Sequence, residues 1–313
     1  MNLQQLRYVR EVARRGLNVS EAAKALHTSQ PGVSQQVQAF EQELGVAVFV
    51  RTGRRLSAVT EAGREVLDIV ERVLAELANL GRVGEEFAAA GRGSLAVAVT
   101  HTQARYALPP VVSVFMKRFP KVRLKLLQGN PHQLARWVLD GEADVAIATE
   151  ALDRYEALVT VPGYQWHHGV VVPSRHPLAR AKAITLEAIA KFPIVTYDAT
   201  FAGRSAIDAA FARRGLAPDI VLTALDSDVI KSYVSLGLGV GLVSSVAFDR
   251  AKDKGLVLRA ADHLFPVQTT RLAFRKGAWL RGYTQEFIRL FVPHLSREAL
   301  EGLAAGRGED FSI

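Results

Sequence analysis

Apolar residues in the first sixty positions recur every three or four residues, the spacing that places side chains on one face of a helix. Residues 18–26 predict a short helix that is capped by either Asn18 or Ser20. Its apolar face consists of small and aliphatic side chains, namely Val19, Ala22, Ala23 and Leu26. A tight turn and a second helix follow, so the pattern predicts two short, packed helices.

The second helix is predicted to run from about residue 29 to residue 44. Either Thr28 or Ser29 can cap it, and Pro31 falls in its first turn, where the missing N–H costs little. Gly45 suits the left-handed residue that follows many helices. These signals define both ends of the helix.

The two faces of this second helix differ in chemistry. The face predicted to be buried carries Val33, Val37, Phe40 and Leu44. The opposite face carries uncharged donors and acceptors, namely Gln30, Ser34, Gln35 and Gln38. Such groups read base edges, and glutamine can pair bidentately with adenine. An ordinary solvated face is the alternative, but such faces usually carry more Glu and Lys, so we favour a DNA-reading helix.

The residues after this helix predict a two-stranded wing. Residues 46–51 and 56–60 read as short strands, and residues 52–55 form the turn between them. Arg51, Arg54 and Arg55 are then placed to contact phosphates or the minor groove of DNA.

Residues 61–90 contain no proline and predict one long helix. Its apolar positions follow a 3.5-residue repeat, which indicates a helix–helix pair; they are Val66, Val70, Val73, Leu77, Leu80 and Phe87. Thirty residues would span roughly 45 Å. Dimerisation through this helix is the preferred interpretation, and packing on its own domain is the alternative. Residues 91–94 then read as a hinge.

From residue 95 the pattern changes to alternating strands and helices, which predicts a mostly parallel α/β architecture. The expected strands are 95–100, 122–128, 144–149, 169–173, 194–197, 220–225 and 270–274. The expected helices are 104–119, 131–140, 185–191, 204–214, 226–236 and 279–292. A loose tail is expected from Ser296 onward.

Two of the predicted strands end in threonine, at Thr100 and Thr149, and Thr102 and Gln103 begin the helix after the first of them. Ligands of open α/β sheets bind at the carboxyl ends of strands and at helix N-termini. Hydroxyls, an amide and free backbone N–H groups can hold sulfate or a carboxylate there. The alternative is that Thr100 and Thr102 only cap the helix.

Other candidates are weaker. Gln128 ends a strand on the same side, and Trp166 either walls the pocket or belongs to the core. The histidines at 101, 167 and 168 lack metal-ligand spacing with acidic partners, so no metal is expected. Asp226 and Asp228 read as the first residues of a helix. Residues 237–241 are glycine-rich but follow a helix, the reverse of a dinucleotide loop, and no catalytic triad can be argued.

Composition narrows the class of protein. The 313 residues, 49% of them hydrophobic, are enough for two or three domains. Cysteine is absent, and neither a signal peptide nor a long apolar run is present, so a soluble cytoplasmic protein is expected. The net charge is +4 in residues 1–60, −4 in 61–90 and +8 in 91–313. The local arginines of the wing are therefore better evidence for DNA binding than the overall charge.

The motif residues of the first domain are Ala22-Ala23, Leu26 to Val37, Glu41, Leu44-Gly45-Val46 and Phe49-Val50-Arg51. With these, residues 1–60 resemble the winged helix-turn-helix of LysR-type transcriptional regulators. The resemblance implies that promoter DNA is bound, with Thr28, Ser29, Gln30 and Pro31 at the start of the reading helix. It also implies a homo-oligomer that dimerises through the linker helix 61–90, with a tetramer as the family norm. RNA polymerase is a further candidate partner.

Three later segments, residues 100–109, 146–152 and 228–231, closely resemble the CysB/Cbl branch of this family, the activators of sulfur-assimilation genes. This resemblance implies a two-lobed effector domain of the periplasmic-binding-protein type over residues 91–295. Lobe I is expected at about 94–163 and 268–293, lobe II at about 164–267, and the tail at 296–313. The implied effector is a small acyl-serine or a sulfur-related anion such as sulfate or thiosulfate. Positions matching Thr100 and Thr102 contact the effector, or an anion in its site, in that branch.

One position departs from the branch pattern, because Ala202 replaces an expected threonine. Losing one hydrogen bond costs about 0.5–1.5 kcal/mol, although the backbone N–H of the residue remains and Thr200 is nearby. The sequence thus predicts an effector-controlled regulator of sulfur genes. Two alternatives remain: a LysR-type regulator with a non-sulfur effector, and an enzyme or carrier built on the two lobes. The reading face and the lack of a catalytic constellation argue against the second.

Overall fold

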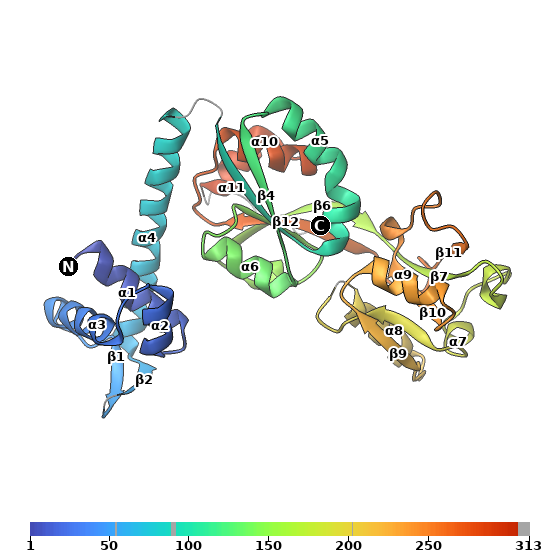
Figure 1. Ribbon diagram of the computed structural model, residues 1–313, viewed down its shortest axis with the longest axis horizontal. Helices are drawn as coiled ribbons and strands as arrows, with labels where there is room; N and C mark the ends of the chain where they lie inside the picture. The colour runs from blue at the N-terminus through green and yellow to red at the C-terminus, as the bar shows by residue number, and fades with distance from the viewer. Residues whose placement is uncertain (54, 89–91, 202, 306–313) are drawn as a thin grey trace. The chain divides into compact units, whose positions relative to one another are not determined.

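The computed structural model describes residues 1–53, 55–88, 92–201 and 203–305. The chain divides into two compact units, Met1–Glu85 and Glu86–Ile313, which we describe separately (Figure 1). Within the described residues, no helix is both long enough and apolar enough to cross a membrane.

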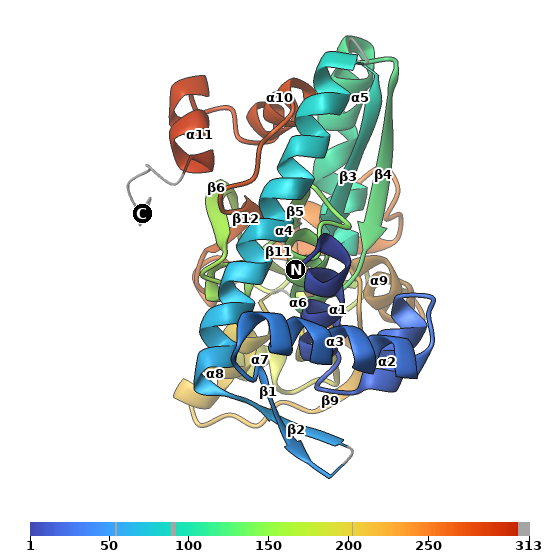
Figure 2. The same cartoon turned by 90° about the vertical axis from the view of Figure 1, so that its left-hand side faces the viewer.

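The first unit is a small helical domain with a hairpin. Its elements are α1 (Leu3–Arg14), α2 (Val19–Ala25), α3 (Gln30–Leu44), β1 (Phe49–Thr52), β2 (Arg55–Val59) and α4 (Glu61–Ala88). The first three helices bury a common core that includes Val9, Val37 and Phe40. Figure 2 shows these helices beside the N-terminal part of α4, with the β1–β2 hairpin projecting from the domain. The predicted winged helix-turn-helix architecture is confirmed.

Helix α4 packs part of its apolar surface in the core of the first unit and leaves other apolar side chains exposed. Val70 and Leu74 are buried in the core of the first unit. Ile69, Val73 and Leu80 are 51%, 41% and 68% exposed. The predicted apolar repeat is therefore split: its N-terminal part packs in the core of the first unit, while a stripe along the helix stays uncovered in the single chain.

The second unit contains two five-stranded sheets, one in each lobe. The strands of lobe I are β3 (Gly93–Val99), β4 (Val122–Gln128), β5 (Val145–Ala148), β6 (Leu158–Trp166) and β12 (Gln268–Arg275). Those of lobe II are β7 (His168–Pro173), β8 (Ile194–Tyr197), β9 (Ile220–Ala224), β10 (Val240–Ser244) and β11 (Leu256–Ala260).

Both sheets contain parallel and antiparallel strands. Lobe I has the strand order β4-β3-β5-β12-β6, and lobe II has the order β11-β7-β10-β8-β9. Strand β12 is antiparallel to β5 and β6, and β7 is antiparallel to β10 and β11. The expectation of mostly parallel sheets is corrected accordingly.

Helices cover the sheets of both lobes (Figure 1). Lobe I carries α5 (Leu108–Arg118), α6 (Pro131–Leu139), α10 (Gly282–Phe291) and α11 (Arg297–Ala304), and lobe II carries α7 (Leu186–Ile189), α8 (Arg204–Arg213) and α9 (Ser227–Ser235). The chain crosses between the lobes twice. His167 alone joins β6 to β7, and the segment between β11 and β12 returns the chain to lobe I. The lobes are thus connected by two short segments.

Three expectations about this unit are corrected. Strands β6 and β11 were not predicted. The helix expected over 104–119 begins instead with a π-helical turn, Gln103–Ala107, before α5. The tail is ordered as far as α11, whose first turn is capped by Ser296, and Leu300 and Leu303 are buried in the core of lobe I. Burial of these two leucines stabilises a segment whose polar surroundings suggested a loose end. Residues 306–313 lie outside the described residues.

Candidate functional site

The reading helix α3 is fixed at both ends by its own residues. The hydroxyl of Ser29 accepts a hydrogen bond from the amide of Gly32 (3.3 Å), so Ser29 rather than Thr28 is the cap. Gly45 ends the helix in a left-handed conformation with φ of 77°. In α2 the cap is Asn18, whose side chain accepts from the amides of Ser20 and Glu21. These caps define where each helix begins.

The reading face consists of Gln30, Ser34, Gln35 and Gln38. The three glutamines are exposed, Ser34 is half-buried, and Gln30 Nε2 donates to Ser34 Oγ at 3.1 Å. Thr28, Ser29 and Pro31 are exposed at the start of the helix. The opposite face buries Val33, Val37 and Phe40, but Leu44 is 38% exposed, so the prediction that Leu44 is buried is wrong. Because α3 ends at Leu44, the core does not reach its last turn.

The base of the wing is tied to α3 by Glu41. One oxygen of this carboxylate accepts from the amides of Val48 (2.8 Å) and Phe49 (3.0 Å), and the other pairs with Arg51 Nη2 at 2.7 Å. Glu41 was part of the family motif, but its role as a wing anchor was not predicted. Arg51 is therefore engaged with a carboxylate, which reduces its availability for phosphate.

Arg55 lies near Gln30, the first residue of the reading helix. It lines a recess of about 440 Å³ together with Gln30 and residues 16–20. A guanidinium beside the first residue of the reading helix is suited to contact a phosphate while α3 contacts bases. Arg54, the other predicted wing residue, lies outside the described residues.

In the second unit, Gln103, Thr149 and Trp166 meet around Thr270 of β12. The indole Nε1 of Trp166 donates to the hydroxyls of Thr149 (3.3 Å) and Thr270 (3.2 Å). Gln103 Nε2 donates to Thr270 at 3.2 Å, and the hydroxyl of Tyr164 donates to Gln103 Oε1. We call Gln103, Thr149, Tyr164, Trp166 and Thr270 the hinge cluster, since it lies where β6 and β12 approach the crossings between the lobes.

Trp166 is buried and its N–H is bonded within the hinge cluster, which fits the alternative that it belongs to the core. Gln103 is also buried. Burial raises the pKa of the Tyr164 hydroxyl, so this group remains a hydrogen-bond donor at neutral pH. Thr270 and Tyr164 were not predicted, because a threonine and a tyrosine within strands carry no distinguishing spacing.

Thr102 reaches across to lobe II. Its side chain does not cap the following turn, so the capping alternative is not supported for this residue. It interacts with the hydroxyl of Tyr197, whose pKa burial raises, while hydrogen bonds to Ser227, Ser244 and Thr102 oppose that rise. Tyr197 is fully buried, contacts Ser227 Oγ at 2.6 Å and accepts from the amide of Ser244 at 2.9 Å. Thr100 is buried directly after β3.

A recess of about 390 Å³ lies between the lobes. Its lobe I side includes His101, Gln128, Asn130 and Gln133. Its lobe II side includes Thr200, Phe201, Leu225 and Asp226. Of the predicted effector residues that the structure describes, only Gln128 lines this inter-lobe recess. The hydroxyl of Thr200 donates to Asp198 at 2.8 Å.

Ala202 lies outside the described residues, but its neighbour Gly203 connects the lobes. The amide of Gly203 donates to Glu150 at 2.7 Å, and burial raises the pKa of this carboxyl. Gly203 has φ of 75°, and a Cβ there would lie 2.1 Å from Nε2 of His168. Only glycine fits this position without displacing the imidazole.

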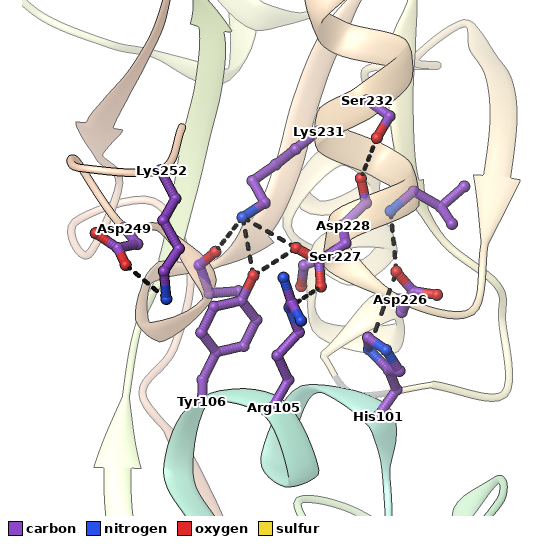
Figure 3. Close-up of polar contacts among 12 residues, drawn as sticks. His101, Arg105, Tyr106, Asp226, Ser227, Asp228, Lys231, Ser232, Asp249 and Lys252 are labelled. Atoms are coloured by element: carbon purple, nitrogen blue, oxygen red, sulfur yellow. Dashed lines mark hydrogen bonds and ion pairs between the residues drawn. The ribbon is translucent and has the colours of Figure 1, made fainter. Parts of the chain in front are cut away.

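A polar network joins the π-helical turn of lobe I to α9 of lobe II (Figure 3). Tyr106 donates to Asp228 at 2.6 Å, and Arg105 Nε lies 2.6 Å from the same carboxylate. The Lys231 ammonium donates to Tyr106 (2.9 Å), to the Ala247 carbonyl (2.7 Å) and to Asp253 (2.9 Å). We call Arg105, Tyr106, Asp228, Lys231 and Asp253 the inter-lobe network. Burial opposes protonation of Lys231, but its hydrogen bonds outweigh this and raise its pKa.

His101 does have acidic neighbours, contrary to the expectation from spacing. Its Nδ1 lies 3.9 Å from the Asp226 carboxylate, and ligand atoms of His101, Asp226 and Asp228 lie within 4.8 Å of one another. Asp228, however, already pairs with Arg105 and Lys231. Two cations at this carboxylate disfavour a metal ion, so the group is poorly suited as a metal site.

Comparison with known proteins matches each of the two units to a protein-family model. Residues 3–64 match the model for the bacterial regulatory helix-turn-helix protein, lysR family, and residues 88–296 match the LysR substrate binding domain. The chain belongs to the LysR family. It is therefore a transcriptional regulator with a helix-turn-helix and an effector-binding domain, and not an enzyme.

Among curated relatives of this LysR-family chain, the HTH-type transcriptional regulator SsuR of Burkholderia cenocepacia is 53% identical, over 97% of this chain and 98% of its own length. The HTH-type transcriptional regulator CysB of the same organism is 51% identical, over all of both chains. The solved cofactor-binding domain of the Cbl transcriptional regulator has a TM-score of 0.66 and 45% identity, and the match covers 68% of this chain and 94% of that one. The resemblance to the CysB/Cbl branch is confirmed.

Proposed function

We propose that this LysR-family chain controls genes for sulfur assimilation, for cysteine biosynthesis or for use of an alternative sulfur source, in response to a small effector bound between its lobes. The similarity to regulators named SsuR, CysB and Cbl over nearly the whole chain supports this. The branch resemblance of residues 100–109, 146–152 and 228–231 points in the same direction.

For DNA, we assign direct base contacts to the reading face of α3 and backbone contacts to the wing. Uncharged, exposed glutamines are suited to base edges in the major groove. Arg55 and Arg54 are assigned to phosphates or the minor groove. Arg51 has a smaller part in this assignment, because Glu41 already pairs with it.

For the effector, the observation that carries the proposal is the recess of about 390 Å³ whose walls come from both lobes. A small acyl-serine, sulfate or a thiosulfate-like anion bound near Thr100, Thr102 and Thr149 would contact residues of both lobes. Such a ligand shifts the lobe arrangement only as far as its affinities for the two arrangements differ. The hinge cluster and the inter-lobe network are the contacts that such a shift would change.

For assembly, we propose a dimer through α4 and a tetramer through the effector domains. The exposed stripe of Ile69, Val73 and Leu80 supports the first contact. Strands β4 and β9 are sheet edges, and exposed apolar side chains lie on or near them, including Leu126 and Val221. A two-fold dimer would match a pseudo-palindromic DNA site.

The test is fluorescence anisotropy with labelled promoter fragments from sulfur-assimilation genes and with an unrelated fragment of equal length. We expect tighter binding to the sulfur promoters, and a change in affinity on adding O-acetylserine, N-acetylserine, sulfate or thiosulfate. Equal binding to all fragments, or no response to any of the four compounds, contradicts the sulfur assignment. The second result would favour a non-sulfur effector, consistent with the alanine at position 202.

A further inference from the structure

The lobe II half of the inter-lobe network is held together by lobe II alone. Lys231 is buried, and its ammonium donates to the Ala247 carbonyl at 2.7 Å and to Asp253 at 2.9 Å. The same ammonium lies 3.4 Å from Asp228. Asp253 is fixed in turn, because it accepts from the amide of Asp249 at 2.8 Å. We call Asp228, Lys231 and Asp253 the lobe II socket, since its buried charge has partners whether or not lobe I is in contact.

Lobe I contributes Tyr106 to the lobe II socket (Figure 3). The Tyr106 hydroxyl donates to Asp228 at 2.6 Å and accepts from Lys231 at 2.9 Å, so it makes a charge-assisted hydrogen bond to each sign of charge. Burial raises the pKa of this hydroxyl, so the donated proton stays in place at neutral pH. Arg105 also pairs with Asp228, but its side chain is 53% exposed, so water and salt weaken that contact. Tyr106 is therefore the stronger connection between the lobes at this point.

The position of Tyr106 is set by the π-helical turn that begins at Gln103. The two prolines after Leu108 have no N–H, so the α-helical hydrogen bonds to the carbonyls of residues 105 and 106 cannot form. The amide of Leu108 donates instead to the Gln103 carbonyl, five residues back. The Gln103 side chain is buried and bonded within the hinge cluster. The turn that carries Tyr106 is thus anchored inside lobe I.

A second polar contact crosses between the lobes at Gly203. Its amide, on lobe II, donates to the Glu150 carboxylate of lobe I at 2.7 Å. Because the donor is a backbone N–H, separation of the lobes frees it for exchange with solvent deuterium. The Gly203 amide therefore reports on contact between the lobes at a place other than Tyr106.

We propose that Tyr106 is a reversible latch, which holds the two lobes together in the ligand-free protein and leaves the lobe II socket intact when it withdraws. A reversible contact must not strand a buried charge when it opens, because an unpaired buried charge is strongly destabilising. The socket meets this condition, since Asp228, Asp253 and the Ala247 carbonyl stay with Lys231. The inference goes beyond the proposed function, because this closure requires neither DNA nor ligand. A ligand that prefers the closed arrangement then finds it already populated.

Residue-resolved hydrogen exchange of the full chain, followed by mass spectrometry without DNA or ligand, tests the latch. The variant is Tyr106→Phe, which keeps the ring beside Lys231 and removes only the hydroxyl. The matched control is Tyr155→Phe, because the Tyr155 hydroxyl is bonded to His132 at 2.9 Å inside lobe I. The amide of Gly203 reports on contact between the lobes, and the amides of β5 and β10 report on the interior of each lobe.

We expect the Gly203 amide to exchange about tenfold faster in Tyr106→Phe than in the wild type, which corresponds to about 1.4 kcal/mol. Tyr155→Phe should keep the wild-type rate. The amides of β5 and β10 should be unchanged in both variants, since each lobe keeps its own core. Equal exchange of Gly203 in the two variants overturns the inference. Faster exchange of β5 and β10 in Tyr106→Phe also overturns it, because Tyr106 would then support the fold of a lobe rather than the contact between lobes.

Promoter binding measured in parallel separates this inference from the proposed function. If Gly203 responds as expected but sulfur promoters are bound no better than unrelated DNA, the latch stands and the sulfur assignment fails. If sulfur promoters are preferred and respond to one of the four compounds while Gly203 exchange is the same in all three proteins, the proposed function stands and the latch is wrong.

Discussion

The reading face of the first unit is assembled from sequence neighbours, whereas the inter-lobe site of the second unit joins distant residues. Gln30 and Ser34 are one helical turn apart. In contrast, Gln103 meets Thr270 across 167 positions and Tyr106 meets Asp228 across 122. A local site can be read from helical spacing, but a site made by chain crossings depends on strand order. Changes in α3 should therefore act on DNA binding alone, while changes between the lobes should affect stability and ligand response together.

Removal of the buried ammonium of the inter-lobe network should have the largest effect. Lys231→Met leaves Asp253 without its cation and removes the hydrogen bond to Tyr106, while Arg105 still pairs with Asp228. Breaking a buried pair typically costs about 3–5 kcal/mol. We expect a loss of unfolding free energy of this order in thermal or urea denaturation. Lys252→Met removes an exposed lysine that pairs with Asp249 and should cost less than about 1 kcal/mol. Equal stability of the two variants would argue against the network.

Acid should destabilise the second unit through His168. Burial between Trp166 and Phe265 lowers the pKa of His168 from 6.5 to about 4. As the pH falls through this range, the unfolded chain takes up the proton first. The free energy of unfolding therefore decreases by about 3 kcal/mol. His168→Phe keeps a ring in this position and should give a flatter dependence of unfolding free energy on pH between 6.5 and 4.

The control for this measurement is His167→Phe, a substitution at the exposed residue next to His168. It should keep most of the steep dependence of the wild type, because burial lowers the pKa of His168 more than the neighbouring His167 does. An unchanged pH dependence in His168→Phe would mean that this imidazole is not the acid-sensitive group.

On the DNA side, Gln35→Ala should lower discrimination between a sulfur promoter and unrelated DNA by about 1–3 kcal/mol if Gln35 contacts a base. Non-specific affinity and thermal stability should stay the same, since the side chain is exposed. Anisotropy with both fragments measures the ratio. Loss of affinity for both fragments in equal proportion would assign Gln35 to the backbone rather than to bases.

The smallest predicted change concerns the wing. Arg55→Ala should weaken binding to all DNA and reduce the slope of log affinity against log salt by about 0.9 for one lost phosphate contact. Arg51→Ala should change this slope less, because Glu41 already pairs with its guanidinium. Titrations at several salt concentrations measure both slopes. Identical slopes for the wild type and Arg55→Ala would make the assignment of Arg55 wrong.

Much of the first unit was predictable because its signals are short-range. The caps at Asn18 and Ser29, the proline at 31 and the glycine at 45 all act within one turn of their helices. The ion pair of Arg51 was not predictable, because Glu41 is ten positions away and belongs to another element. Leu44 was misplaced because periodicity does not show where a core ends.

In the second unit, sequence reasoning identified strand-end threonines but not their partners. Thr149 and Gln103 meet through Thr270, which β12 brings back from near the end of the chain. Nothing in the local pattern distinguishes Thr270 from Thr269. The network of Tyr106 and Lys231 likewise depends on how the two lobes meet. Such sites become visible only when the strand order and the crossings are known.

The central claim is that the effector acts between the lobes while α3 reads DNA, and one paired titration tests it directly. Affinity for a sulfur promoter should be measured in Thr102→Ala and Gln35→Ala, with and without O-acetylserine, N-acetylserine, sulfate and thiosulfate. We predict that Thr102→Ala keeps the affinity of the free protein for DNA but loses the response to ligand. Gln35→Ala should lose promoter discrimination but still bind the ligand. Loss of both properties together in Thr102→Ala would contradict the claim and make Thr102 a structural residue.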